Sequence, residues 1–353
     1  MSREPPEPVP SPRSPVPGLW SPVPGPRSVV PGPRSLVIGT RGSPLALWQA
    51  NHVAARLRSA EPGITVLLET IKTTGDKILD MPLAQVGGKA LFVKEIEEAL
   101  LEGRVDLAVH SMKDVPTDLP PGLAIVAITE REDPLDVLIS RTGRGLQDLP
   151  RGARVGTSSL RRQAQLLHYR PDLAIIGLRG NLDTRIRKLR SEGLDAIVLA
   201  AAAIKRLGWT DCVTEFLPPE VCLPAIGQGA LGIEMREASA SSVEPPSAER
   251  RAPSLQRIVG VLDHSETRAA VLAERAFLRR LEGGCQVPFA AHAEVGGGRL
   301  LLRGLVASPD GKRILRGERS GGCEKSEGLG TALAEDLLDR GAGEIIDAVL
   351  RRS

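Results

Sequence analysis

Aromatic side chains are scarce in this sequence, at 2% of 353 residues. Proteins that bind single-stranded nucleic acids stack bases on aromatic rings, so the scarcity argues against such a partner. The formal net charge is only +3, which does not indicate a polyanionic partner for the chain as a whole. No apolar run reaches about 18 residues, and the N-terminus lacks the basic start and apolar block of a secretory signal. We therefore expect neither a nucleic-acid partner nor a membrane partner.

Cysteine is sparse as well. The four cysteines, at 212, 222, 285 and 323, are scattered, and none forms a CxxC pair or stands at metal-ligand spacing beside a histidine. This usage predicts no metal site and favours a reducing, cytoplasmic location. We also expect the protein to act as a monomer.

Residues 1–34 contain 12 prolines and near-repeats such as Ser-Pro-Val-Pro-Gly at 14–18 and 21–25. That composition cannot build a hydrophobic core, so it predicts a disordered tail. An organelle transit peptide is the weaker alternative, because Glu4, Glu7 and the proline density oppose an amphipathic helix.

From Ser35 onward, short leucine-rich or β-branched runs alternate with amphipathic helical stretches, which is typical of a mainly parallel α/β sheet. The first block predicts strands at 36–39, 65–71 and 107–110, with helices at 44–57 and 92–102. The second block predicts strands at 154–156, 174–177 and 196–200, with helices at 159–169 and 182–190. After a flexible connection, a third block predicts a helix at 268–281, hairpin turns at 296–298 and 309–311, and a closing helix at 329–350.

The second block is strongly basic. Residues 151–206 hold ten arginines and two lysines against four acids, which indicates an anionic partner or a strongly solvated face. For Arg187, Lys188 and Arg190 the solvated helix face is the better interpretation. Phosphates and carboxylates both bind arginine, but the low aromatic content favours carboxylates over nucleic acid.

Two segments of this block predict an anion pocket. In the run 155–162, a strand ends, hydroxyl residues follow at a helix N-cap, and Arg161 and Arg162 stand in the first turn. Free backbone N–H groups and the helix dipole then face an anion together with guanidinium forks, although a plain cap without a ligand is the alternative. In the run 178–185, Arg179 and Arg185 flank the start of the next helix and can point to the same edge of the sheet.

A carboxylate and a thiol are the candidates for chemistry. Lys113 and Asp114 follow the end of a buried strand, so they are placed at a sheet edge, where a carboxylate can stabilise developing positive charge. Cys285 stands in a glycine-flanked loop after an amphipathic helix, and nearby arginines would favour a nucleophilic thiolate. The plainer alternatives are surface charge for the first pair and a buried apolar residue for the cysteine.

At this point the chain resembles the porphobilinogen deaminases, over about residues 35–353. The resemblance rests on the ordered motifs Gly39-Thr-Arg-Gly-Ser-Pro-Leu-Ala46, Thr73-Thr-Gly-Asp-Lys77, Gly88-Lys-Ala-Leu-Phe-Val-Lys-Glu95, His110-Ser-Met-Lys-Asp114, the runs 156–162 and 179–185, Gly227-Gln-Gly-Ala-Leu-Gly232 and Glu282-Gly-Gly-Cys285. It implies an α/β fold of three domains, of which the first two resemble a type II periplasmic binding protein pair with a cleft between them. The third is a small α/β domain that carries the cofactor cysteine.

The domain boundaries that follow from this resemblance are 35–131 plus 227–236 for domain 1, 132–226 for domain 2 and 255–353 for domain 3, with a flexible connection at 237–254. The chain is expected to leave domain 1 near Arg131 and to return through 227–232, so that the two crossings form a hinge.

The resemblance also implies the chemistry. Four porphobilinogen molecules are joined head to tail with loss of ammonia to give hydroxymethylbilane, primed by a dipyrromethane cofactor on a thioether to Cys285. The carboxylates of this cofactor are expected to contact Lys113, Thr157, Ser158, Arg161, Arg162, Arg185 and Arg206. Arg41, Ser43 and Arg179 are expected to hold the incoming monomer, and Asp114 to stabilise the cation formed when ammonia leaves. Since each pyrrole brings two carboxylates, the arginine excess is accounted for.

The main alternative is a non-catalytic two-domain binding module for small polycarboxylate anions. It predicts no covalent adduct and no requirement for Cys285, so a mass measurement separates the two interpretations.

Overall fold

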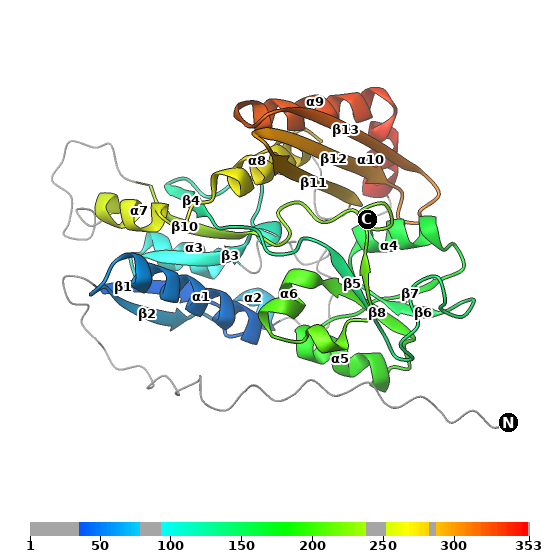
Figure 1. Cartoon of the computed structure of the whole chain (residues 1–353), viewed down its shortest axis with the longest axis horizontal. Coiled ribbons are helices and arrows are strands. Elements are labelled where there is room, and N and C mark those ends of the chain that lie inside the picture. The colour runs from blue at the N-terminus through cyan, green and yellow to red at the C-terminus, as the bar shows by residue number, and fades with distance from the viewer. Residues whose placement is uncertain (1–34, 78–92, 238–251, 282–286, 352–353) are drawn as a thin grey trace.

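A computed structural model describes residues 35–77, 93–237, 252–281 and 287–351 of the chain (Figure 1). The proline-rich tail at 1–34, most of the predicted connection and Cys285 lie outside the described residues. The described residues form three sheets flanked by helices, which confirms the predicted α/β class. None of the helices in these ranges combines the length and apolar character needed to cross a bilayer.

The first sheet has the strand order β2-β1-β3-β10-β4. Its strands are β1 (Ser35–Thr40), β2 (Thr65–Thr70), β3 (Leu107–Ser111), β4 (Leu123–Ile128) and β10 (Leu231–Arg236), and its helices are α1 (Pro44–Ala60), α2 (Thr74–Lys77), α3 (Lys94–Leu101) and α7 (Ala252–Gly260). β1 runs parallel to β2 and β3, whereas β10 is antiparallel to both of its neighbours. Leu36 and Ile38 of β1 are fully buried on one face, in a cluster with residues of α1, whereas Val37 packs on the other face against residues of α3. Helices therefore cover both faces of this strand.

The second sheet repeats this plan with the order β7-β6-β8-β5-β9. Its strands are β5 (Asp136–Ser140), β6 (Arg154–Gly156), β7 (Ala174–Ile176), β8 (Ala196–Ala200) and β9 (Glu215–Leu217), and its helices are α4 (Leu160–Tyr169), α5 (Leu182–Ser191) and α6 (Ala201–Arg206). Here β5 is the antiparallel strand. The chain passes to this sheet between β4 and β5, and it returns between β9 and β10. The first strand after each crossing, β5 in the second sheet and β10 in the first, is therefore the one that runs antiparallel to both of its neighbours.

The third sheet is an antiparallel meander of β11 (Phe289–Gly296), β12 (Arg299–Ala307) and β13 (Ile314–Gly322). The two-residue turn Gly297-Gly298 has positive φ at both residues, which confirms the predicted hairpin. Helices α8 (Ser265–Arg280) and α9 (Ser326–Asp339) pack on this sheet around the fully buried Phe277. They approach so closely that a Cβ at Gly330 would collide with the carbonyl oxygen of Ala273.

The structure corrects several predicted elements. The closing helix is broken into α9 and α10 (Ala342–Leu350), because Gly341 adopts a left-handed φ of 94° that no continuous helix accommodates. Helix α7 begins at Ala252, inside the predicted flexible connection, and packs against β4 and α1. Strands β4, β5, β9 and β10 were not predicted. Strands β5, β9 and β10 each include a charged residue, whereas β4 is the wholly apolar run Leu-Ala-Ile-Val-Ala-Ile and was missed although its composition suits a buried strand.

Candidate active site

Helix η3 (Met112–Asp114), a single 3₁₀ turn directly after β3, presents the predicted catalytic carboxylate. Met112 is buried, and its backbone N–H donates to the carbonyl oxygen of Ala230 at 3.0 Å. The two side chains that follow Met112 are more accessible: Lys113 is half-buried and Asp114 is exposed. Asp114 makes no hydrogen bond or ion pair with the described part of the chain.

Hydroxyl groups hold the segment before α4. Ser159 is the N-cap and accepts a hydrogen bond from the Arg162 backbone N–H at 3.4 Å. Buried Thr157 accepts at Oγ1 from the Ser159 N–H at 3.2 Å. The Ser158 hydroxyl donates to the carbonyl oxygen of Leu178 at 2.8 Å and accepts from its N–H at 2.9 Å. These bonds join two loops at the carboxyl ends of parallel strands, which is where α/β folds bind ligands.

The two arginines of α4 share a carboxylate that sequence reasoning missed. Asp136 opens β5 and is completely buried. Nη1 of Arg161 lies 2.7 Å from its Oδ2, and Nη2 of Arg162 lies 2.7 Å from its Oδ1. The guanidiniums also donate to backbone carbonyls, that of Arg161 to Leu223 at 2.6 Å and that of Arg162 to Val198 at 3.0 Å. A carboxylate at the start of the apolar run Asp-Val-Leu-Ile was the available signal, because a buried charge needs a partner.

The ionisation of this group follows from its contacts. Burial alone would raise the pKa of Asp136, but the charges and hydrogen bonds of the α4 arginines hold it far below its ordinary value. The Cys222 thiol donates to Asp136 Oδ2 at 3.2 Å, and burial together with this carboxylate raises the pKa of Cys222 to about 12. Asp136 is therefore ionised at neutral pH and Cys222 is a neutral thiol. One carboxylate neutralises only one of two guanidiniums, so a positive charge is left for a ligand.

Gln228, in the second crossing, links this group to the turn that carries Asp114. Its Nε2 donates to Asp136 Oδ1 at 3.0 Å, and its Oε1 accepts from Lys113 Nζ at 3.4 Å. Removal of the ammonium from water lowers the pKa of Lys113 to about 8; the α4 guanidiniums add to this lowering, and the two nearby carboxylates oppose it. A lysine with this pKa is held in a basic, partly dehydrated environment.

Arg185 of α5 completes the group. Its Nε donates to the carbonyl oxygen of Gly180 at 2.8 Å. Burial and the repulsion from Arg162 lower the pKa of Arg185 to about 10, against the attraction of Asp114, and Arg179 lowers it further. Arg185 therefore experiences the charge of Asp114, which follows β3 of the first sheet, as well as that of Arg162 of the second. Arg179 makes no hydrogen bond or ion pair with the described residues.

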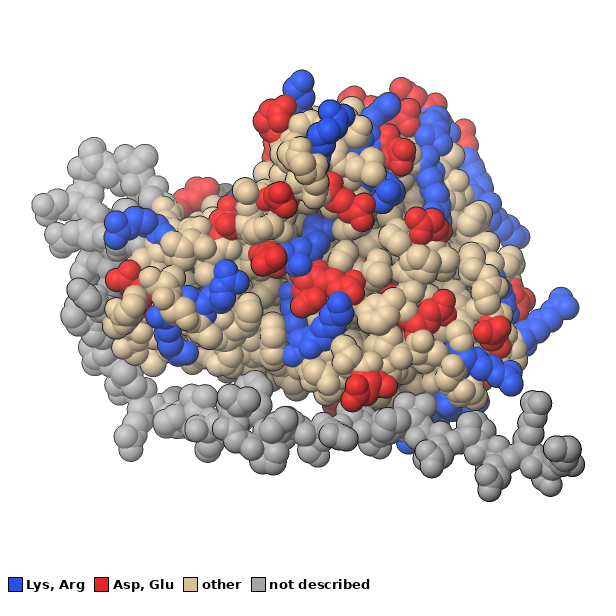
Figure 2. Space-filling model, viewed as in Figure 1, with Lys and Arg blue, Asp and Glu red and all other residues tan. Residues whose placement is uncertain are grey.

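Positive charge is thus in excess where the first two sheets meet. Five cations, Lys113, Arg161, Arg162, Arg179 and Arg185, and two carboxylates, Asp114 and Asp136, influence one another electrostatically here. Three positive charges are left uncompensated within this group. A partly buried excess of this kind is relieved by an anionic ligand, and guanidinium forks suit carboxylates. On the face of the molecule drawn in Figure 2, by contrast, basic and acidic side chains are interspersed.

Arg206 stands at the end of α6. It is buried, and its Nη2 donates to the carbonyl oxygen of Gly229 at 2.6 Å. The guanidinium carbon lies 5.8 Å from the centroid of the Trp48 ring of α1, which is cation–π geometry. Arg206 therefore connects α6 to helix α1 of the first sheet and to the second crossing, between β9 and β10.

The residues predicted for the monomer are split between the two sheets. Arg41 follows β1 and forms an ion pair with Asp76, and Ser43 is the N-cap of α1, where its hydroxyl accepts from the Ala46 N–H at 3.4 Å. Burial alone would raise the pKa of Asp76, but hydrogen bonds from Arg41 and Thr73 lower it overall. Cys285, the predicted attachment site, lies outside the described residues.

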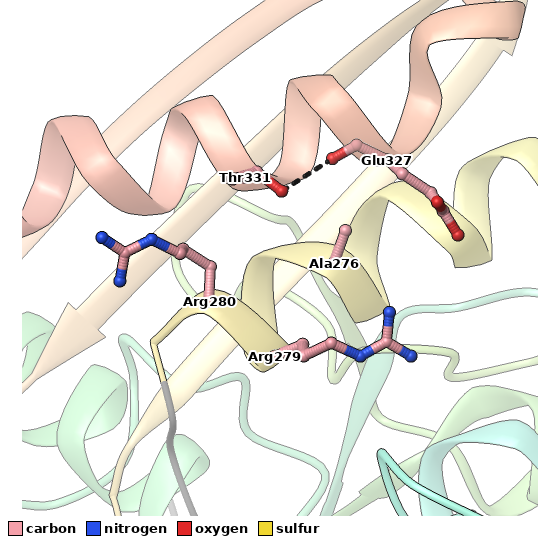
Figure 3. A pocket seen from close by; sticks show the side chains of 5 residues that line it. All are labelled: Ala276, Arg279, Arg280, Glu327 and Thr331. Carbon is pink, nitrogen blue, oxygen red and sulfur yellow. Dashed lines mark hydrogen bonds between the residues drawn. The ribbon is translucent and has the colours of Figure 1, made fainter.

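A separate cavity of about 250 Å³ lies on the third domain, between α8 and α9 (Figure 3). Its lining consists of Ala276, Arg279, Arg280, Glu327 and Thr331. No predicted site residue lines it, so this cavity is distinct from the group of five cations.

Comparison with known proteins decides the family. One family model, described as porphobilinogen deaminase, dipyromethane cofactor binding domain, matches residues 36–244, and a second, porphobilinogen deaminase, C-terminal domain, matches residues 268–339. This chain belongs to the porphobilinogen deaminase family. Porphobilinogen deaminase of Pelobacter propionicus is 56% identical over 313 residues, covering 89% of this chain and 96% of the relative. That of Geobacter metallireducens is 57% identical, covering 89% and 94%.

The solved structures that this chain resembles include periplasmic binding domains. The periplasmic VFT2 domain of BvgS from Bordetella pertussis has a TM-score of 0.37 at 12% identity, covering 64% of this chain and 86% of that one. A periplasmic binding protein of Salmonella typhimurium with high arginine specificity has a TM-score of 0.34 at 15% identity, covering 65% and 91%.

The family matches confirm the predicted enzyme class and the dipyrromethane cofactor. The residues present fit that cofactor, because three uncompensated positive charges lie within the segment that matches the cofactor-binding model. Carboxylate side chains on pyrrole rings are the anions that such a group would neutralise.

Proposed function

We propose that this member of the family joins four porphobilinogen molecules head to tail where its first two sheets meet, releasing ammonia and forming hydroxymethylbilane. Family membership supports the reaction. The observation that carries its location is the excess of cations beside the exposed carboxylate of Asp114, which has no hydrogen-bond or ion-pair partner among the described residues. The alternative of a non-catalytic polycarboxylate-binding module is not favoured, because the relatives matched over nearly their whole length are named as deaminases.

We assign the cofactor carboxylates to the five-cation group and its neighbours: Lys113, Thr157, Ser158, Arg161, Arg162, Arg185 and Arg206. When bound through Cys285, dipyrromethane supplies the pyrrole end to which substrate is added. The Asp136 carboxylate fixes the guanidiniums of the α4 arginines in place before any ligand arrives, which lowers the conformational cost of binding.

Asp114 is the proposed catalytic residue. Its exposed carboxylate can accept hydrogen bonds from pyrrole N–H groups of the substrate and stabilise the positive charge that develops as the amine departs. Arg41, Ser43 and Arg179 are proposed to hold the carboxylates of the incoming monomer. Of these, Arg179 makes no hydrogen bond or ion pair with the described residues, so it can bind an anion without breaking an existing contact.

Intact-mass measurement tests this assignment. The purified protein should be heavier than its sequence by one dipyrromethane, and the excess mass should be lost in Cys285→Ser together with turnover of porphobilinogen. Cys222→Ser is the matched control, because its thiol is buried with a pKa near 12 and should carry no adduct. An unmodified mass in active wild-type protein, or full activity in Cys285→Ser, would contradict the proposal.

We further propose that the enzyme acts as a monomer in the cytoplasm, without nucleic acid or membrane. In support, Cys212, Cys222 and Cys323 are free thiols, as is usual in a reducing compartment. Light scattering during size-exclusion chromatography should give the mass of a single chain, and a dimer mass would contradict the proposal.

A further inference from the structure

Helix α8 of the third domain reaches the segment that follows Asp114. The side chain of Arg275 donates three hydrogen bonds to consecutive carbonyl oxygens there: Nη1 to Val115 at 3.3 Å, and Nη2 to Pro116 at 2.6 Å and to Thr117 at 2.9 Å. A planar guanidinium fork can hold several carbonyls in a fixed arrangement, which the single ammonium of lysine cannot reproduce.

The same face of α8 also packs beneath the Asp114 turn. Val271, four residues before Arg275 and therefore one helical turn away, is fully buried and packs in one cluster with Met112 and Val115. These two residues flank Lys113 and Asp114 in sequence. Helix α8 thus holds the segment on both sides of the carboxylate, by apolar packing at Val271 and by hydrogen bonds at Arg275.

The Asp114 turn has little stability of its own. It is one 3₁₀ turn with a single backbone bond from the Val115 N–H to the carbonyl oxygen of Met112 at 3.3 Å, and its N-cap, Ser111, makes no side-chain capping bond. Isolated 3₁₀ turns have poor hydrogen-bond geometry, so external contacts must set the position of an exposed side chain within them. The contacts from α8 supply that constraint.

We propose that Arg275 is a positioning residue for the Asp114 carboxylate, so that the third domain contributes to the reaction through α8 as well as through its cofactor cysteine. This inference rests on the catalytic role proposed for Asp114. It assigns to Arg275 no contact with substrate.

Steady-state kinetics of cofactor-loaded protein, with loading verified by intact mass, tests the proposal. Arg275→Met should lower kcat about 10- to 100-fold with less than about a threefold change in KM, because a displacement of the order of 1 Å has that effect on rate. Arg275→Lys should recover part of the loss. Arg268→Met is the matched control: Arg268 lies on the same helix and donates to the carbonyl oxygen of Val126 in β4 at 2.9 Å, away from Asp114. Its kcat should stay within about twofold of wild type.

A double-mutant comparison separates positioning from general stability. In an Asp114→Ala background, adding Arg275→Met should change kcat by less than about twofold, since the group that Arg275 positions is gone. If the two losses in kcat multiply in the double variant, or if Arg275→Met alone leaves kcat unchanged, the proposal is overturned. If Asp114→Ala alone keeps wild-type turnover, the catalytic assignment itself fails. If Asp114→Ala is impaired and Arg275→Met is not, only the role of Arg275 fails. Should Arg275→Met not fold, Arg275→Lys carries the same comparison.

Discussion

The carboxylate of Glu274 accepts two hydrogen bonds from the guanidinium of Arg131, at 2.8 and 3.1 Å, and is completely buried. Glu274 belongs to α8, whereas Arg131 lies in the first crossing between the sheets. The same carboxylate accepts from the Gly227 N–H of the second crossing at 2.6 Å and from the Ala293 N–H of β11 at 2.8 Å. One side chain of the third domain therefore holds both crossings.

Removing one partner of this pair should destabilise the whole protein. Glu274→Leu is expected to lower the free energy of unfolding by about 3–5 kcal/mol, because it leaves the Arg131 charge buried without its carboxylate. Urea unfolding followed by circular dichroism measures the effect. The control is Glu335→Gln, which breaks the exposed pair with Arg280 and should change stability by no more than about 0.5 kcal/mol. Equal effects of the two substitutions would contradict a structural role for Glu274.

The same pair predicts how stability depends on pH. Burial alone would raise the pKa of Glu274, but the charge of Arg131 and the hydrogen bonds from Arg131 and His292 lower it to about 2, from an ordinary value of 4.5. A depressed carboxyl pKa stabilises the folded state above the unfolded pKa, and the stabilisation is lost as pH falls from about 4.5 toward about 2. Glu274→Gln should therefore lose less stability than wild type over this window. Urea unfolding midpoints of both proteins, measured at each pH, test this expectation. If the midpoints of Glu274→Gln and wild type fall in parallel with pH, Glu274 does not contribute to the pH dependence of stability.

Asp114→Ala should cut turnover by more than about 100-fold, in line with the loss of one electrostatic group at a reacting centre. Its thermal midpoint should stay close to wild type, because the side chain is exposed and without a hydrogen-bond or ion-pair partner among the described residues. Asp118→Ala, in the same loop and also exposed, serves as control and should keep wild-type turnover. Near-normal kcat in Asp114→Ala would refute the catalytic role.

Lys113 should be unusually reactive in cofactor-free protein. With a pKa of about 8, half of its amines are neutral at pH 8, and the neutral amine is the nucleophile. Acetylation of Cys285→Ser protein, read by peptide mass spectrometry across pH 7–10, should show a midpoint near pH 8 at this residue. Loaded wild-type protein should label more slowly at Lys113, because cofactor carboxylates would favour the ammonium. Exposed Lys94 provides the internal reference, and equal labelling of Lys113 in both proteins would contradict its cofactor contact.

Local sequence predicted β1, β2 and β3 of the first sheet and β6, β7 and β8 of the second, and it missed β4, β5, β9 and β10. The strands at 154–156 and 196–200 were predicted with the bounds that the structure has, because buried strands are short apolar runs between charged or glycine-containing segments. The start of α4 followed from the hydroxyl residues that precede it, and the Gly297-Gly298 hairpin from its two glycines. Motif order alone indicated the family.

The sequence by itself determined helices α1, α3, α4, α5 and α8, the strands of the basic block and the family, since these depend on residues close to one another along the chain. Only the tertiary structure decided that Asp136 neutralises one of the α4 arginines, that Arg206 contacts Trp48, and that Arg275 holds the segment after Asp114. Such pairings join residues from different elements and domains. They depend on how the sheets and helices pack together, which no local pattern of residues records.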